Sequence, residues 1–215
     1  MRKIITALLL IGLAALPTST AYGLSIGVKQ GDWIAYNVSV TGDMPGHDAQ
    51  WARMDVVSVQ GSVINTNMTT QFTNGTYLYE NITLNLETGQ LGDDFFIPAH
   101  LSPGDTFYDA HAGNIAISSS EQRTYAGAQR TVLLGHTDVT SFVWDKQTGI
   151  LVEAYSNYSS INFTMKTVTS KTNIWQPQTS ALDATTLAYF LIAVVVTVIV
   201  IDALLVWRRK RRAKQ

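Results

Sequence analysis

Alternation of apolar and polar residues is the feature that most constrains the fold of this chain. Between residues 22 and 182, apolar side chains recur at every second position, as in Ile34, Tyr36 and Val38. A period of two places these side chains on one face of an extended strand and the polar ones on the other. No convincing apolar period of 3.6 residues, which would predict a helix, occurs in this segment. We therefore predict an all-β segment whose antiparallel strands each bury one face.

Turn signals separate the alternating runs. The pair Asn74-Gly75 is typical of a tight hairpin and predicts that residues 62–72 and 76–86 are paired strands. Residues 146–149 predict a second turn of this kind. Because strand-sized runs recur about every 10–14 residues, the pattern favours a meander. We expect that meander to form a curved sheet, a sandwich or a partial barrel.

The N-terminal end has the three parts of a secretory signal peptide. Arg2 and Lys3 are basic, and the apolar run over residues 4–16 is too short to span a bilayer. Small residues precede a cleavage site after Ala21. Residues 1–21 are therefore interpreted as a signal peptide, and an uncleaved N-terminal anchor is the alternative.

A second apolar run, residues 187–207, lies near the C-terminal end and has Asp202 as its single charged residue. At about 1.5 Å per residue, such a helix reaches about 31 Å and spans a membrane. The following residues, 208–215, contain six basic residues among eight. Lys and Arg accumulate on the cytoplasmic side, which predicts a cytoplasmic tail and an extracellular N-terminal domain. We expect a single-pass protein of the cell membrane, in contact with its lipid bilayer.

Asp202 has two interpretations. A carboxylate within a membrane helix is costly and by default suggests a functional contact, here with the membrane helix of a partner protein. However, Asp202 lies five residues before Trp207, so its side chain could instead reach headgroup water or pair with Arg208.

The segment between the β region and the membrane helix is polar and contains Pro177, which is typical of a stalk. The predicted organisation is a signal peptide over 1–21, an extracellular β domain over 22–168, a stalk over 169–186, a transmembrane helix over 187–207 and a basic cytoplasmic tail over 208–215.

Glycosylation sequons are unusually dense. Six of the ten asparagines begin an Asn-x-Ser/Thr sequon, whereas the Ser and Thr content predicts about two by chance. We predict four on the polar faces of strands (Asn37, Asn67, Asn81 and Asn162) and two in turns (Asn74 and Asn157). A glycan requires a solvated face, so these positions agree with the alternation. The alternative is a polar face rich in Ser, Thr and Asn that forms sequons by accident.

Composition and motifs exclude several classes of function. A net charge of −1 and the absence of cysteine exclude a basic nucleic-acid-binding domain, a disulfide scaffold and a cysteine-ligated metal site. The four histidines have no helical metal-ligand spacing, and no G-x-S-x-G nucleophile motif occurs. We expect no cofactor and no enzymatic activity. One sequence does not exclude the pair of carboxylates that a glycoside hydrolase uses, because that pair has no fixed motif.

Aromatic residues are the remaining candidates for binding. Trp33, Trp51, Trp144 and Trp175 lie in the exported segment, and Tyr77 and Tyr79 share the polar face of one predicted strand. These rings could stack on sugars or cover a ligand groove. Cross-strand packing, which aromatic residues favour in sheets, is the alternative.

Parts of the sequence resemble two known families. The segments GDWIAY (31–36), DDFFIPAHLSPGDTFY (93–108), RTYAGAQRTV (123–132) and VWDKQTGILVE (143–153) are similar to small archaeal surface proteins of unestablished function. That family implies a signal peptide, a sequon-rich β ectodomain and one C-terminal anchor. The last segment also resembles a strand-turn-strand of periplasmic lipoprotein carriers of the LolA and LppX type. This second resemblance implies a curved sheet that holds acyl chains, although the carriers' helices have no counterpart here.

These observations predict a non-enzymatic, N-glycosylated surface protein. Its β domain would bind envelope proteins, glycans or lipid, or would maintain the envelope. One alternative is a membrane-tethered lipid or lipoprotein binder, which requires an apolar cavity within the curved sheet. Another is an accessory subunit of a membrane complex that uses Asp202 as its contact.

Overall fold

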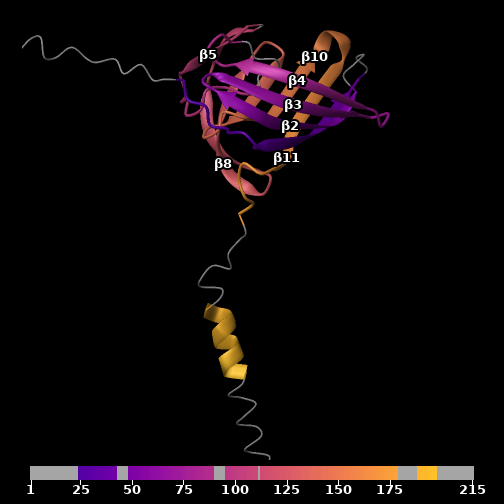
Figure 1. Cartoon of the computed structure of the whole chain (residues 1–215). Coiled ribbons are helices and arrows are strands. Elements are labelled where there is room, and N and C mark those ends of the chain that lie inside the picture. The colour runs from indigo at the N-terminus through magenta and orange to yellow at the C-terminus, as the bar shows by residue number, and fades with distance from the viewer. Residues whose placement is uncertain (1–23, 43–47, 90–94, 111, 179–187, 198–215) are drawn as a thin grey trace, which may run out of the picture. The chain divides into compact units, whose positions relative to one another are not determined.

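A computed structural model describes residues 24–42, 48–89, 95–110, 112–178 and 188–197 (Figure 1). The chain divides into two compact units, Met1–Gln176 and Pro177–Gln215. In the second unit a helix covers residues 188–197, part of the predicted membrane span. Within the described residues, no helix has both the length and the apolar character needed to cross a membrane. The predicted signal peptide, Asp202 and the basic tail lie outside the described residues.

The first unit is built from nine antiparallel strands in one sheet, as the alternation predicts. The sheet order is β4-β3-β2-β1-β11-β10-β9-β8-β7. Its strands are β1 (Trp33–Thr41), β2 (Ala49–Gln60), β3 (Val63–Phe72), β4 (Tyr77–Asn85), β7 (Ser119–Tyr125), β8 (Ala128–His136), β9 (Thr140–Asp145), β10 (Leu151–Tyr158) and β11 (Phe163–Thr172). Two meanders, β1–β4 and β7–β11, join where β1 pairs with β11.

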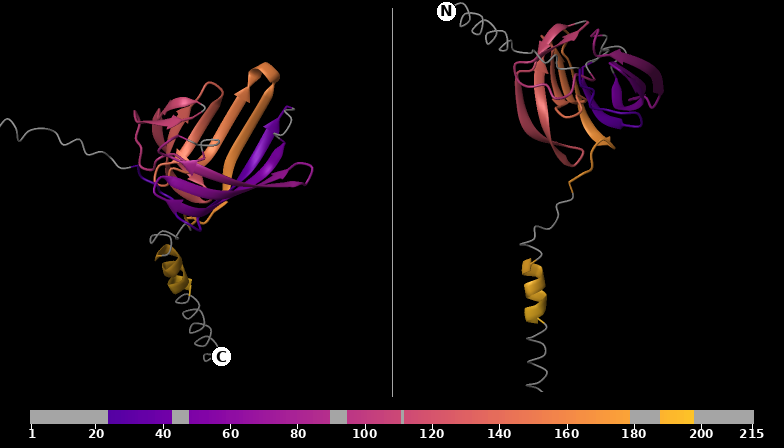
Figure 2. Two further views of the ribbon diagram at one scale, coloured as in Figure 1. Left: turned by 45° about the horizontal axis from the view of Figure 1, so that its top comes forward. Right: turned by 60° about the vertical axis from the view of Figure 1, so that its left-hand side comes forward.

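Curvature brings the two meanders to face each other (Figure 2). The nine strands form a single open sheet with β4 and β7 at its edges, so the sheet is curved rather than a sandwich of two sheets. A separate two-stranded hairpin, β5 (Thr106–Asp109) and β6 (Gly113–Ala116), belongs to the long connection between the meanders.

Side chains fill the face of the sheet that the curvature turns inward, which we call the inner face. On β1, Ile34 and Tyr36 are fully buried there, as the alternation predicts. The connection between the meanders packs on the same face, because Phe95 lies 6.0 Å from the ring of Tyr36 and Phe107 lies edge-on to Trp144 at 5.3 Å. The Tyr36 hydroxyl donates a 2.9 Å hydrogen bond to a β10 carbonyl, so its buried polar group is satisfied.

Both predicted hairpins are confirmed, and side-chain hydrogen bonds explain them. The amide oxygen of Asn74 accepts hydrogen bonds from the backbone N–H of Thr76 (2.9 Å) and from its hydroxyl (2.7 Å). The Asp145 carboxylate likewise accepts from the backbone N–H (2.9 Å) and the hydroxyl (2.8 Å) of Thr148. These contacts close the two turns locally.

The boundary predicted between the domain and the stalk is wrong. Strand β11 continues to Thr172, which pairs with Ile34 at the start of β1. Trp175 is also buried, and its indole N–H donates a 3.0 Å hydrogen bond to the carbonyl of Tyr125. The polar residues 169–172 belong to strand β11, in which polar and apolar side chains alternate, and not to a stalk. The domain therefore extends through Trp175.

Candidate functional site

The face of β1–β4 opposite the inner face is here called the outer face. It carries four of the six aromatic residues that the sequence singled out, namely Trp33, Trp51, Tyr77 and Tyr79, whereas Trp144 and Trp175 are buried elsewhere. Residues directly paired in an antiparallel sheet project on the same side. Asn37 pairs with Trp51, Trp51 with Gln71, and Gln71 with Tyr77. These four residues therefore form one row across β1–β4.

Two further rows lie beside the first. Arg53, Thr69 and Tyr79 are paired across β2–β4. The third row crosses β1–β4: Trp33 pairs with Asp55, Asp55 with Asn67, and Asn67 with Asn81. The outer face is thus a surface of aromatic rings, amides and hydroxyls with one acid and one base.

A bulge in β2 shapes a hollow on this face. The register shifts between Ala49 and Trp51, so Gln50 has no partner of its own in β3. A β-bulge bends its strand and redirects a side chain. Gln50 and Trp51 line an open hollow of about 550 Å³ together with Thr69, Gln71 and Tyr77.

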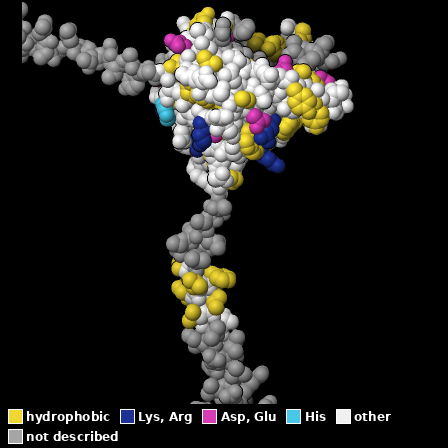
Figure 3. Space-filling model, in the orientation of Figure 1, with side chains coloured by type: hydrophobic (Ala, Val, Ile, Leu, Met, Phe, Trp, Pro, Cys, Tyr) yellow, Lys and Arg dark blue, Asp and Glu magenta, His cyan; other side chains and the backbone are white. Residues whose placement is uncertain are grey.

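The two tyrosines of β4 are exposed rather than packed into the fold. Tyr77 is 51% exposed and Tyr79 is 73% exposed. Their rings are nearly parallel, at an interplanar angle of 18° and a centroid distance of 6.3 Å. Figure 3 shows hydrophobic side chains gathered on this side of the molecule, next to a small group of charged ones. Two neighbouring aromatic rings left in water make this face a candidate binding surface.

The charges on the outer face neutralise each other. Arg53 donates hydrogen bonds to both carboxylate oxygens of Asp55 at 2.6–3.1 Å. The Arg53 guanidinium also lies 4.2 Å from the ring centroid of Trp33. The hydrogen bonds that Arg53 donates to Asp55 raise the pKa of the Arg53 guanidinium. Arg53 and Asp55 therefore satisfy each other on this face, and the exposed Lys171 of β11 lies beyond Ala35 in the same row.

All six sequon asparagines are exposed. Asn37, Asn67 and Asn81 lie on the outer face, and Asn74 lies in the β3–β4 turn, as predicted. The expected places of Asn157 and Asn162 are reversed. Asn157 is in strand β10, whereas Asn162 adopts a left-handed conformation with φ of 52° after the short 3₁₀ turn η2 (Ser159–Ile161). An asparagine tolerates this conformation better than most residues, so the turn falls there.

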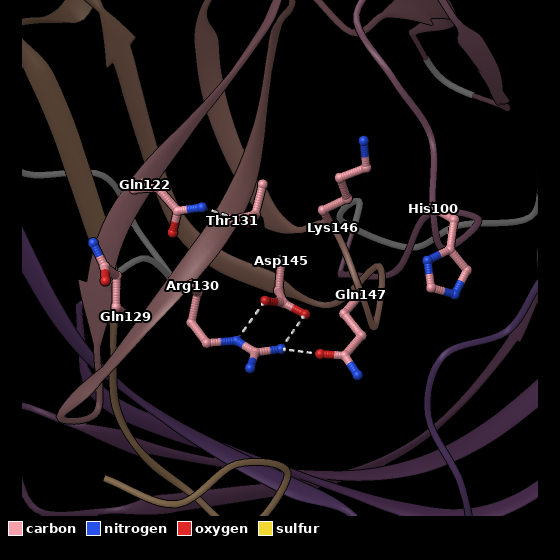
Figure 4. A pocket seen from close by; sticks show the side chains of 8 residues that line it. All are labelled: His100, Gln122, Gln129, Arg130, Thr131, Asp145, Lys146 and Gln147. Atoms are coloured by element: carbon pink, nitrogen blue, oxygen red, sulfur yellow. Dashed lines mark hydrogen bonds and ion pairs between the residues drawn. The ribbon is translucent and has the colours of Figure 1, made fainter. Parts of the chain in front are cut away.

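A second, polar hollow of about 410 Å³ lies beside the β9–β10 turn (Figure 4). Its central residue, Arg130, donates to the Asp145 carboxylate at 2.8 Å and 3.1 Å and to Gln147 at 3.0 Å. The Arg130 guanidinium also lies 4.8 Å from the ring centroid of Trp175. The Lys146 side chain points away from Arg130 and Asp145 in Figure 4. Because Arg130 is already hydrogen-bonded to Asp145 and Gln147 and stacks on Trp175, we interpret the hollow as part of a structural network that fixes Trp175 in place.

A polar cluster links β7, β10 and β11. Tyr125 donates a 2.7 Å hydrogen bond to Glu153, and Lys166 lies 3.2 Å from the same carboxylate. Burial alone would raise the pKa of Glu153, but the Tyr125 hydrogen bond and the Lys166 charge outweigh it and lower that pKa. Burial and the bond to Glu153 raise the pKa of Tyr125 to about 12. The cluster joins distant strands and leaves no free acid or base.

Among the described residues, no group of three His, Cys, Asp or Glu side chains could hold a metal ion. His47, Asp93 and Asp94 are among the residues with metal-ligating side chains that lie outside the described residues.

The sequence identified the aromatic residues of the outer face but missed their polar neighbours. Gln50, Thr69 and Gln71 have no motif, and only the strand register brings them to Trp51 and Tyr77. The alternation of Trp51, Arg53 and Asp55 is a signal that could have placed part of this surface.

Comparisons with known proteins place the chain in no family. No family model matches the sequence, and no curated protein matches it. Among solved structures it is similar to an exported protein with a YmcC-like fold from Bacteroides fragilis, at 9% identity and a TM-score of 0.39 over 70% of this chain and 99% of that one. It is also similar to the siderocalin Ex-FABP, at 14% identity and a TM-score of 0.25 over 75% of this chain and 80% of that one. Likenesses this remote carry no argument about the fold or the ligand of this chain.

Proposed function

We propose that this protein is an exported, membrane-tethered binding protein whose outer face binds uncharged glycans outside the cell. The observation that carries the proposal is the hollow lined by Trp51, Tyr77 and three polar side chains, beside the exposed ring of Tyr79. The proposal includes the sequence-based signal peptide over 1–21 and the membrane helix over 187–207.

Carbohydrate chemistry matches this surface. A sugar ring presents C–H groups on its faces, which pack on flat aromatic rings such as those of Trp51 and Tyr77. Its hydroxyls both donate and accept hydrogen bonds, as do the amides of Gln50 and Gln71 and the hydroxyl of Thr69. Arg53 and Asp55 pair with each other, so neither offers an unpaired charge to an ionic ligand.

The lipid-binding alternative is less well supported. It requires an apolar cavity on the inner face, but the described side chains of Tyr36, Phe95, Phe107 and Trp144 pack together there. The alternative of a complex subunit depends on Asp202, which lies outside the described residues.

Binding measurements on the full chain in detergent micelles test the proposal. Neutral soluble oligosaccharides prepared from the envelope of the source cells serve as the probe. We expect Trp51→Ala and Tyr77→Ala to weaken binding about tenfold or more, as the loss of central aromatic contacts does. Tyr108→Ala is the matched control, because Tyr108 is 54% exposed but lies on the β5–β6 hairpin. Equal affinities of the wild type and Trp51→Ala would contradict the proposal.

A further inference from the structure

One predicted modification site lies directly beside the proposed binding site. Asn37 of β1 pairs with Trp51 of β2, and both project from the outer face. Side chains of directly paired residues have Cβ atoms about 4.5–5.5 Å apart. Asn37 and Ser39, the first and third residues of this sequon, are both exposed.

From this adjacency we propose that an N-linked glycan on Asn37 lies over Trp51 and regulates the hollow by competing with external ligands. The inference rests on the proposed glycan-binding function. The occupant is a sugar chain carried by this protein itself, and the chemistry that recognises it is the same ring stacking and amide hydrogen bonding that would recognise an external glycan.

The modification requires a lipid-linked sugar phosphate as the donor. The side-chain amide nitrogen of Asn37 attacks the anomeric carbon of that sugar and forms the N-glycosidic bond. The bond between the anomeric carbon and the phosphate oxygen breaks, the lipid-linked phosphate leaves with its electron pair, and the amide nitrogen loses one proton. No oxidant or reductant is needed.

In the part of the chain that the structure describes, no other sequon asparagine is paired directly with Trp51. Asn74 lies in the β3–β4 turn, three residues after Gln71 and three before Tyr77. Asn67 lies two residues before Thr69 on β3, which is about 7 Å along a strand, and four residues before Gln71, the partner of Trp51. Asn81 pairs with Asn67 and is equally displaced from the row that contains Trp51. Asn157 and Asn162 belong to the β10–β11 hairpin. Asn37 is the sequon asparagine that lies directly beside Trp51, so its glycan is the one that we assign to that ring.

An attached ligand competes at a high local concentration. A short flexible link gives an effective concentration in the millimolar range, so a glycan on Asn37 masks the hollow from weakly binding free sugars. Chains without that glycan would bind free sugars more tightly. The occupancy of Asn37 would thus set the fraction of molecules that are open to external ligands.

Two variants that remove the sequon in different ways test this inference in the full chain. Asn37→Gln removes the attachment atom, whereas Ser39→Ala keeps Asn37 and removes the hydroxyl that the sequon requires. We expect both to bind the neutral envelope oligosaccharides several-fold more tightly than the glycosylated wild type. Thr164→Ala, which removes the Asn162 sequon on the far hairpin, is the matched control and leaves the affinity unchanged.

The outcomes separate this inference from the proposed function. Mass spectrometry that finds Asn37 unmodified in the native protein would overturn the inference. A wild type that binds with the same affinity as Ser39→Ala would also overturn it, while the binding function would stand. If neither the wild type nor the two sequon variants bind, the proposed function fails, and the inference fails with it.

Discussion

Asp145 illustrates how a single buried residue organises the end of the domain. Its side chain is 1% exposed and accepts hydrogen bonds from Thr148 and from Arg130, whose side chain is 17% exposed. Through Arg130 the same carboxylate is linked to the ring of Trp175. Removing one partner of a buried ion pair leaves the other charge buried without its countercharge, here with the hydrogen bonds from Thr148 that remain.

We therefore predict that Arg130→Met lowers the free energy of unfolding by about 3–5 kcal/mol. The matched control is Arg53→Met on the outer face, where the pair with Asp55 is far more exposed, at 36% and 40%. That change should cost at most about 1 kcal/mol. Urea unfolding followed by circular dichroism measures both, and equal losses would contradict the assignment of Arg130 to a buried network.

Glu153 makes the stability of the domain depend on pH. Because its pKa is lowered in the folded state, the stabilisation from its contacts is complete above the unfolded pKa of about 4.3 and is lost as pH falls through the folded value. We predict that Glu153→Gln is less stable than the wild type at pH 7 and that this difference shrinks below pH of about 4. Thermal unfolding across this pH range measures it, and a constant difference would count against the role of Glu153.

At the scale of elements, close packing fixes the β5–β6 hairpin against the sheet. Gly135 of β8 has no room for a side chain, because an added Cβ would lie 2.9 Å from the Trp144 ring and 3.1 Å from a β6 carbonyl oxygen. We predict that Gly135→Ala destabilises the domain by about 1–3 kcal/mol through overpacking. Combining it with Trp144→Phe, which frees space, should cost less than the sum of the two single changes. Strict additivity in unfolding measurements would show that Trp144 is not the obstacle.

Local patterns predicted the strands well but not how distant strands align. The alternation placed Ile34 and Tyr36 in the core, and the Asn74-Gly75 turn fixed one hairpin, since both signals act over a few residues. The pairing of β1 with β11 joins residues more than 120 positions apart, and no local pattern encodes it. For that reason the domain boundary after 168 was wrong, and Gln50 and Gln71 were not assigned to the candidate site.

At the scale of the whole molecule, the proposed function requires that the β domain face the exterior. Residues 208–215 provide six positive charges for a cytoplasmic end. We predict that protease added to intact cells removes the domain and leaves a C-terminal epitope within residues 208–215 undigested. Lysed cells are the control, in which the epitope is lost as well. A domain that is protected in intact cells would contradict the topology.

The most direct test of the proposed glycan-binding surface is nuclear magnetic resonance of the full chain in micelles, which follows the indole N–H signals of the tryptophans. Trp51 lines the hollow on the outer face, whereas Trp144 lies in the core and Trp175 is buried near Tyr125. On addition of neutral envelope oligosaccharide, we predict that the Trp51 signal shifts in a saturable way while the signals of Trp144 and Trp175 do not. A shift of Trp144 with Trp51 unmoved would place the ligand on the inner face and contradict the proposal.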